Sequence, residues 1–142
     1  MKALMIGGTG VISTSVSQLA LAQGWDVTLL NRGSRSSEVP GARQLIADMN
    51  DEAAVRVALS EETYDVVADF IAFRPEQVER DIRLFSGRTH QYIFISSASA
   101  YHKPLPSPII NEGTSLSNPF WQYSRDKIAC EEALNARMRE TG

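Results

Sequence analysis

The sequence predicts an α/β protein with a doubly wound parallel sheet of about five strands and helices on both faces. Three observations predict this class. Short apolar runs alternate with helical patterns along the whole chain. The runs are apolar at successive positions, which is typical of strands buried on both faces. A glycine-rich turn, GGTG, joins the first run to the first helical pattern. Right-handed crossovers between parallel strands then favour the doubly wound topology.

The first third of the chain supplies two strands and one helix. The run at residues 2–6 predicts the first strand. The pattern at residues 11–23 predicts a helix that ends before the stop signal Gly24, with Leu19 and Ala22 on its apolar side. The run DVTLL then predicts a second strand.

A serine- and glycine-rich stretch, NRGSRSSEVPG, follows the second strand and predicts a loop. Residues 43–48 are expected to form a third strand, and residues 51–60 a helix. The valine-rich run at residues 64–70 predicts a fourth strand that is buried on both faces.

The last third of the chain continues the alternation. Pro75 suits the first turn of a helix that runs to about Phe85. Residues 91–96 predict the fifth strand. A proline-bearing loop at residues 101–119 precedes the last helix, and loops of this length are often functional.

The composition narrows the class of protein. A hydrophobic share of 43% and a charged share of 22% over 142 residues are typical of one folded globular domain. The net charge of −3 argues against nucleic-acid binding, which usually needs a basic surface. Cys130 is the single cysteine, which fits a reducing cytoplasm and excludes a disulfide within one chain. No apolar run approaches the roughly 18 residues of a membrane span. His90 and His102 lie apart from any ligand cluster, so no metal site is expected.

The glycine turn predicts a dinucleotide site. A turn of this spacing between a strand and a helix is the context that the dinucleotide fingerprint requires. Gly7 would allow the tight turn, Gly10 would let the pyrophosphate approach the backbone, and Thr9 could add a hydroxyl. Ser13 stands at the third glycine position, where a small residue still packs, at some loss of fit. The alternative is a plain turn that binds nothing. The candidate cofactor residues here are Gly7, Thr9, Gly10, Val11 and Ile12.

The end of the second strand favours NADP over NAD. An acidic residue there would bind the ribose 2′-hydroxyl of NAD, but Asn31 and Arg32 stand in its place. A guanidinium suits a 2′-phosphate, and Ser34 and Arg35 lie in the same loop. The alternative is a solvated loop that contacts no ligand. Asp48, after the third strand, could bind the adenine amino group or cap the following helix.

Tyr123 and Lys127 form a candidate catalytic pair. Their spacing of four residues places them on one face of a helix. A neighbouring ammonium favours the phenolate, which lets a tyrosine exchange a proton at neutral pH. Ser96, Ser97 and Ser99 follow the fifth strand, at the end of the sheet where such folds bind ligands. The alternative is an amphipathic helix on which both residues lie at the surface.

These motifs resemble the extended short-chain dehydrogenase/reductase superfamily, which includes the NAD-dependent epimerases and dehydratases. The resemblance runs along essentially the whole chain and rests on GGTGVIS, SSASAY and YSRDK. It implies that Ser97, four residues before Tyr101, is catalytic. It also implies that Tyr123 is the acid/base during hydride transfer, and that Lys127 binds the nicotinamide ribose as well.

The resemblance implies an NAD(P)-dependent epimerase, dehydratase or reductase acting on a small polar substrate, with a nucleotide sugar as one candidate. The segment ADFIAF departs from the His-Leu-Ala-Ala type of the sugar epimerases. Together with NRG, it is similar to a branch that includes chloroplast stem-loop RNA-binding proteins. The alternatives are therefore a non-catalytic dinucleotide-sensing module and an RNA-binding relative on the same fold.

The resemblance also sets an expectation for the domain organisation. Residues 1–142 match the NAD(P)-binding Rossmann domain, whereas the family's fold continues with a further strand and a smaller substrate-binding domain. The chain is therefore expected to be truncated and inactive alone. Its fifth strand would lie at a sheet edge, which invites association with another chain. We accordingly expect a homo-oligomer or an aggregation-prone monomer.

Overall fold

The computed structural model describes residues 1–33, 39–105 and 107–141. The chain divides into two compact units. The first, here called the sheet unit, comprises Met1–Ile71 and Arg80–Ile95. The second, here called the α4 unit, comprises Ala72–Glu79 and Ser96–Gly142. Each unit is described by itself. Ser34 and Arg35, which the sequence places in the cofactor loop, lie outside the described residues.

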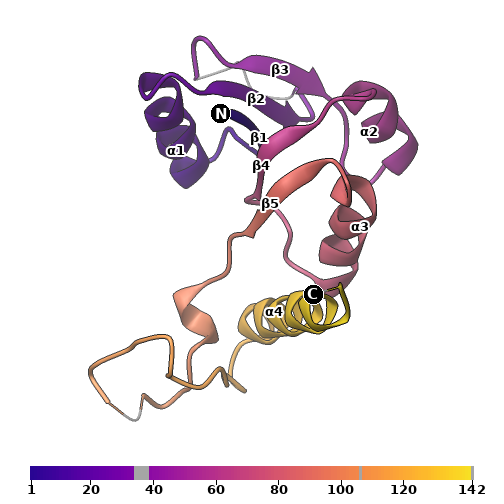
Figure 1. The fold of residues 1–142 in the computed structure, drawn as a ribbon. Helices are drawn as coiled ribbons and strands as arrows, with labels where there is room; N and C mark the ends of the chain where they lie inside the picture. The colour runs from indigo at the N-terminus through magenta and orange to yellow at the C-terminus, as the bar shows by residue number, and fades with distance from the viewer. Residues whose placement is uncertain (34–38, 106, 142) are drawn as a thin grey trace. The chain divides into compact units, whose positions relative to one another are not determined.

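The sheet unit contains one five-stranded sheet in which every pair of neighbouring strands is parallel (Figure 1). Its strands are β1 (Lys2–Ile6), β2 (Asp26–Asn31), β3 (Arg43–Ile46), β4 (Tyr64–Asp69) and β5 (Thr89–Phe94). Their order, β3-β2-β1-β4-β5, changes direction at β1, as in a doubly wound fold. The predicted fold class is confirmed. The largest error is in β5, which begins and ends two residues earlier than predicted.

The helices follow the predicted order. They are α1 (Val11–Ala22), α2 (Glu52–Leu59), α3 (Pro75–Phe85), the short 3-10 helix η1 (Ala98–Ala100) and α4 (Gln122–Thr141). The side chain of Asp51 accepts a hydrogen bond from the Ala54 amide at 3.0 Å and so fixes the start of α2. The alternative in which Asp48 caps this helix is therefore wrong. Among the described residues, no helix combines the length and the apolar character that crossing a bilayer requires.

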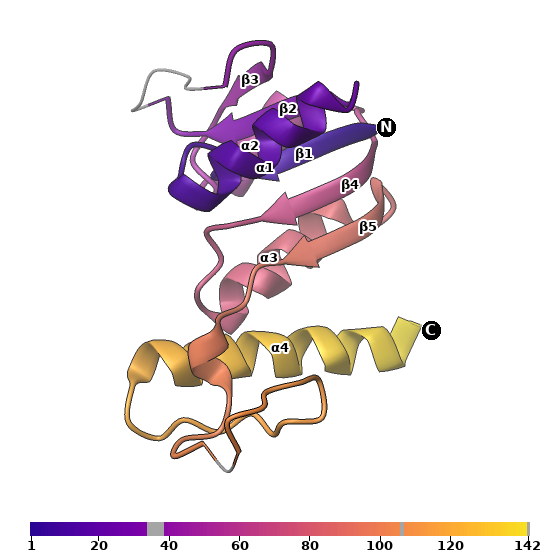
Figure 2. The ribbon, with the colours of Figure 1, turned by 90° about the vertical axis from the view of Figure 1, so that its left-hand side faces the viewer.

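Apolar side chains cover both faces of the sheet. Figure 2 shows α1 in front of the sheet and α2 behind it. Side chains that alternate along β1 enter two separate clusters because successive residues of a strand point to opposite faces. One cluster comprises Ala3, Met5, Ala20, Val27, Leu29, Val39 and Ala68. The other comprises Leu4, Ile6, Leu30, Ala47, Met49, Val55, Leu59, Tyr64, Val67, Leu84 and Phe85.

Helix α1 packs on the sheet through small residues, contrary to the prediction. Ser13, Ser17 and Ala20 are buried, whereas Leu19 is 61% exposed. Ala22 is exposed as well. Small side chains let the helix backbone lie close to the strands, which large apolar residues would prevent.

The α4 unit consists of the long loop and α4, together with η1 and the first residues of α3. A β-bridge joins Tyr101 to Leu116 across the loop. The Asn118 side chain donates a hydrogen bond to the Ser99 carbonyl at 2.8 Å and so ties the end of the loop to η1. Figure 2 shows the loop folded back beneath α4.

Candidate functional site

The glycine turn lies at the carboxyl end of β1. Gly7 has φ +75°, and a Cβ atom at this position would lie 2.3 Å from the Cγ2 atom of Ile71. Its amide donates to the Leu30 carbonyl at 2.9 Å, and its carbonyl accepts from the Thr9 amide at 2.8 Å. Conformation and space therefore both require glycine at position 7.

Ser13 completes the turn in place of a third glycine. Its side chain is 1% exposed. Its hydroxyl accepts a hydrogen bond from the Gly10 amide at 2.8 Å. The carbonyl oxygens of Gly7 and Gly10 lie within reach of the same hydroxyl, at 3.0 and 3.2 Å. Serine was expected to pack less closely than glycine at this position. Its hydroxyl instead adds hydrogen bonds to the turn that glycine cannot make.

The start of α1 offers amide groups to an anion. The first hydrogen bond that closes a helical turn runs from the Thr14 amide to the Gly10 carbonyl, at 2.9 Å. The amides of Val11 and Ile12 precede it, so neither has a partner within the helix. A helix N-terminus of this kind favours negative charge. The position of both residues is therefore compatible with the predicted pyrophosphate site.

The ends of β1, β2 and β3 meet at one edge of the sheet. The register pairs Ile6 with Leu30, and Asn31 with Ile46. The glycine turn, the Asn31–Arg32 pair and the segment before α2 thus follow neighbouring strand ends. In doubly wound sheets this edge is where ligands bind.

The Asn31 side chain is engaged within the sheet unit. Its Oδ1 atom accepts from the Gly33 amide at 2.8 Å, and its Nδ2 atom donates to Gln44 at 2.9 Å. Arg32 is exposed. Asp48 is also exposed, and its carboxylate accepts from the Asn50 amide at 2.9 Å. Asn31 therefore shapes the loop, and Arg32 extends from it toward solvent.

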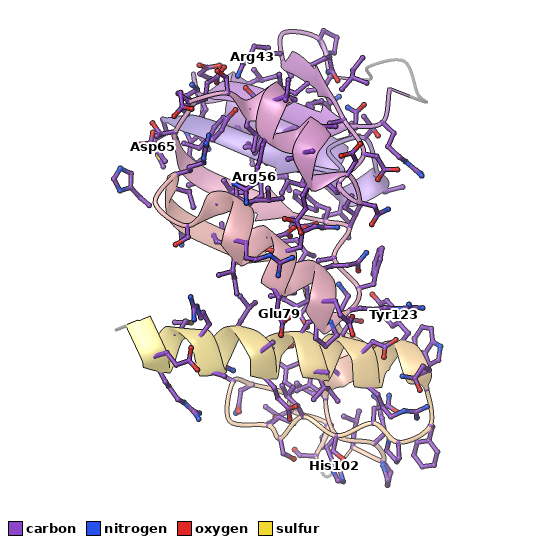
Figure 3. All side chains as sticks on the ribbon, turned by 90° about the vertical axis from the view of Figure 1, so that its right-hand side faces the viewer. Arg43, Arg56, Asp65, Glu79, His102 and Tyr123 are labelled. Carbon is purple, nitrogen blue, oxygen red and sulfur yellow. The ribbon has the colours of Figure 1, made fainter. Side chains whose placement is uncertain are left out.

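Tyr123 and Lys127 lie together in the α4 unit. Figure 3 shows Tyr123 at the end of α4 where the helix begins. The Lys127 ammonium lies 5.9 Å from the centre of the Tyr123 ring and 4.8 Å from that of Phe73. It donates a hydrogen bond to the Ala72 carbonyl at 2.8 Å, and the residue is only 2% exposed. These contacts exclude the alternative in which Lys127 is a surface residue.

Aromatic rings flank Tyr123 on both sides. The centres of the Trp121 and Phe73 rings lie 4.8 and 6.2 Å from that of Tyr123. Within the part of the chain that the structure describes, the Tyr123 hydroxyl makes no hydrogen bond. The ring is thus held by packing while its hydroxyl stays available. Phe73 ends the segment ADFIAF, but the sequence did not indicate that its ring would lie beside Tyr123.

Ser97 belongs to a chain of hydroxyl groups that ends on α4. The Ser97 and Ser99 hydroxyls lie 2.9 Å apart. Ser99 accepts a second hydrogen bond, also of 2.9 Å, from the hydroxyl of Ser124. Ser124 neighbours Tyr123 in sequence, so this chain of hydroxyls connects η1 to the helix that carries the candidate pair. Sequence reasoning missed Ser124, although it lies inside the motif YSRDK. Ser96 instead donates to Glu131.

In the described ranges, no three residues among His, Cys, Asp and Glu gather in a way that could hold a metal ion.

The two groups of candidate residues lie in different units. The sheet unit carries the candidate cofactor residues, and the α4 unit carries Ser97, Tyr123 and Lys127.

Comparisons with known proteins identify the family of this chain. The model of the "NAD dependent epimerase/dehydratase family" matches residues 3–142. A UDP-glucose 4-epimerase from Lactobacillus helveticus is 29% identical over 94% of this chain and 46% of its own length. The chloroplast stem-loop binding protein of 41 kDa b from Arabidopsis thaliana is 32% identical over 72% of this chain and 30% of its own.

Solved structures show the same fold. The UDP-glucose 4-epimerase from Bifidobacterium longum, in complex with NAD+ and UDP, has a TM-score of 0.85 at 21% identity. The dTDP-glucose 4,6-dehydratase from Bacillus anthracis, in complex with NAD, has a TM-score of 0.80 at 15% identity. Each similarity covers 99% of this chain and about half of the solved one. The chain belongs to the NAD-dependent epimerase/dehydratase family.

Proposed function

We propose that this chain is the cofactor-binding part of an NAD(P)-dependent epimerase or dehydratase, in which Tyr123 is the acid/base. The observation that carries the proposal is the buried ammonium of Lys127, 5.9 Å from the Tyr123 ring. Burying a charge is costly unless it is paired or hydrogen-bonded, and the Ala72 carbonyl supplies one such hydrogen bond to Lys127. A charge at this position stabilises a phenolate on the neighbouring ring.

The proposed reaction divides the work among three side chains. Tyr123, as phenolate, takes the proton from a substrate hydroxyl and returns it in the reverse step. Lys127 stabilises the phenolate, and Ser97 donates a hydrogen bond to the same substrate oxygen. A bound nicotinamide would accept the hydride from the carbon that bears this oxygen and give it back. The glycine turn, with the amides of Val11 and Ile12, would hold the pyrophosphate.

A nucleotide sugar is the proposed substrate. The support comes from the relatives, because a UDP-glucose 4-epimerase and a dTDP-glucose 4,6-dehydratase share this fold. For the cofactor, the structures named above contain NAD. The preference for NADP rests on this chain alone, in which Arg32 follows Asn31 where an acidic residue would select NAD. A cytoplasmic location likewise rests on the single cysteine.

The first prediction tests the acid/base assignment by removing one functional group at a time. In the protein expressed from its complete reading frame, Tyr123→Phe should lower epimerase or dehydratase turnover at least a hundredfold. Dinucleotide affinity should change little, because the phenol acts on the substrate. Lys127→Met should impair both. Assays with UDP-galactose and dTDP-glucose, together with a fluorescence titration of NAD, provide the measurements.

Tyr101→Phe is the matched control, since Tyr101 is a half-buried tyrosine of the same unit. It should retain near-normal turnover. If Tyr123→Phe kept near-normal turnover as well, the acid/base assignment would be wrong.

A second candidate function is RNA binding. The 32% identity to a chloroplast stem-loop binding protein favours it, and the net charge of −3 opposes it. A mobility-shift assay with a stem-loop RNA separates the two functions. A shift at physiological salt, without dinucleotide binding, would favour this second function.

A further inference from the structure

The Ser13 hydroxyl closes the glycine turn from inside. It accepts a hydrogen bond from the Gly10 amide at 2.8 Å and can donate one to the Gly7 carbonyl at 3.0 Å. With the residue 1% exposed, water cannot replace these partners. One buried side chain therefore links both glycines of the fingerprint.

A buried serine on α1 does not have to make the hydrogen bonds that Ser13 makes. Ser17, one turn further along the same face, is also fully buried. Within the described part of the chain, its hydroxyl has no hydrogen-bond partner. The helix thus accepts a buried serine without hydrogen bonds at position 17, whereas Ser13 is bonded to the turn.

These hydrogen bonds change which amides are available to a ligand. The Gly10 amide points to the Ser13 hydroxyl, so it is not aimed at an anion in the free protein. The amides of Val11 and Ile12 remain, because the first helical hydrogen bond starts at Thr14. A turn that is held before binding loses less conformational freedom when the ligand arrives.

We propose that Ser13 is a positioning residue, which holds the Gly7–Gly10 turn in its cofactor-ready form and directs the pyrophosphate to the amides of Val11 and Ile12. This inference rests on the proposed function, since it assumes that the turn binds a dinucleotide. It gives the serine at the third glycine position a role beyond packing.

The test compares Ser13→Gly with wild type and with the control Ser17→Ala. Ser13→Gly restores the glycine of the fingerprint, so a role in packing alone predicts normal or tighter binding. Positioning predicts that ADP-ribose and NAD bind about tenfold more weakly, the equivalent of one hydrogen bond. Adenosine, which lacks the pyrophosphate, should be unaffected. Ser17→Ala should bind all three ligands as wild type does, and Ser13→Thr, which keeps the hydroxyl, should restore most of the affinity.

Amide hydrogen exchange gives a readout that needs no ligand. The Gly10 amide should exchange slowly in the free wild-type protein and rapidly in Ser13→Gly. Equal ADP-ribose affinity in wild type and Ser13→Gly would overturn the inference, as would equal exchange rates at Gly10. A wild-type chain that binds no dinucleotide but protects Gly10 would instead overturn the proposed function, along with any role of Ser13 in binding.

Discussion

Lys127 shows which contacts of a single residue a sequence spacing can predict and which it cannot. The spacing from Tyr123 predicted a shared helix face, and the structure places the ammonium beside that ring. Two further partners, the Ala72 carbonyl and the Phe73 ring, come from the segment after β4, more than fifty residues away in sequence. A helical spacing is a local property, so it can pair two side chains. It cannot identify which distant backbone carbonyl will hold a charge.

Arg32 carries the second prediction. Wild type should bind NADP more tightly than NAD, because the guanidinium can pair with the 2′-phosphate. Arg32→Ala should lower the NADP-to-NAD affinity ratio about tenfold, the usual effect of losing one charge-assisted hydrogen bond. Isothermal titration calorimetry with both dinucleotides measures this ratio.

Arg56→Ala is the control for the general loss of a positive charge, since Arg56 is exposed on α2. It should leave the ratio unchanged. An identical ratio in wild type and Arg32→Ala would show that the end of β2 does not select NADP.

At the scale of elements, α1 shows why a helix can be located correctly and oriented wrongly. The glycine before it and the stop signal after it set its bounds. Its buried face was assigned to Leu19 because large apolar residues are usually buried. The helix instead lies close to the strands, so small residues face inward and Val11 and Leu19 face solvent. The sequence does not state the distance between a helix and a sheet, and that distance decides which side chains fit.

A cluster of charged and polar side chains lies buried between α3 and the last two strands of the sheet unit. The Asp81 carboxylate accepts from the Arg80 guanidinium at 2.8 Å and from the Tyr92 hydroxyl at 2.8 Å. The neighbouring Asp69 carboxylate accepts a hydrogen bond from the Ile71 amide. Ile71 in turn covers Gly7. The cluster therefore supports the turn that carries the first glycine.

The third prediction concerns the pH dependence of stability. Burial, and then the hydrogen bond to Asp69 and its charge, raise the pKa of Asp81 to about 8. Between about pH 4 and pH 8, folded Asp81 therefore keeps a proton that the unfolded chain has released. Because the folded state binds more protons in this range, the free energy of unfolding should fall as the pH rises. The slope contributed by Asp81 is at most about 1.4 kcal/mol per pH unit. Urea unfolding at a series of pH values measures it.

Asp81→Asn should flatten this slope, since an amide does not titrate. Its single oxygen can accept from Arg80 or from Tyr92 but not from both, so the variant should also be less stable at every pH. Glu62 provides a contrast of opposite sign. Its hydrogen bond with Arg43, and then that with Lys2, lower the pKa of Glu62 to about 2. Glu62 therefore adds to the free energy of unfolding above about pH 4.5, and this contribution is lost as the pH falls toward 2. Glu62→Gln should therefore lower the free energy of unfolding by a constant amount above about pH 4.5 and flatten the slope only below that pH. An unchanged slope in Asp81→Asn would contradict the prediction.

At the scale of the whole molecule, the alternation of strands and helices was enough to predict the sheet. The glycine turn stays the basis of the predicted cofactor site. The sequence did not predict that the candidate residues belong to two compact units. Unit membership depends on contacts between distant segments, such as that between Lys127 and Ala72. Composition shows no boundary at any of the three points where the chain passes from one unit to the other.

The last prediction concerns association between copies of this chain. In the described sheet β5 pairs only with β4, so its other edge carries backbone groups without a strand partner. Such an edge invites pairing with another chain. We therefore expect the purified 142-residue chain to form oligomers or to aggregate, and to show no turnover of UDP-galactose. Light scattering coupled to size-exclusion chromatography, over a hundredfold range of concentration, measures the state.

Ile93→Lys tests whether β5 is the edge that associates. Ile93 lies on β5 with an exposed side chain, and lysine on an edge strand opposes edge-to-edge pairing. The variant should shift the chain toward monomer. Val57→Lys is the matched control, because Val57 is 81% exposed on α2, away from the sheet edge. If both lysine variants dissociated the oligomer equally, general charge repulsion would be the cause instead of strand pairing. A strictly monomeric wild-type chain with robust turnover would contradict the prediction altogether.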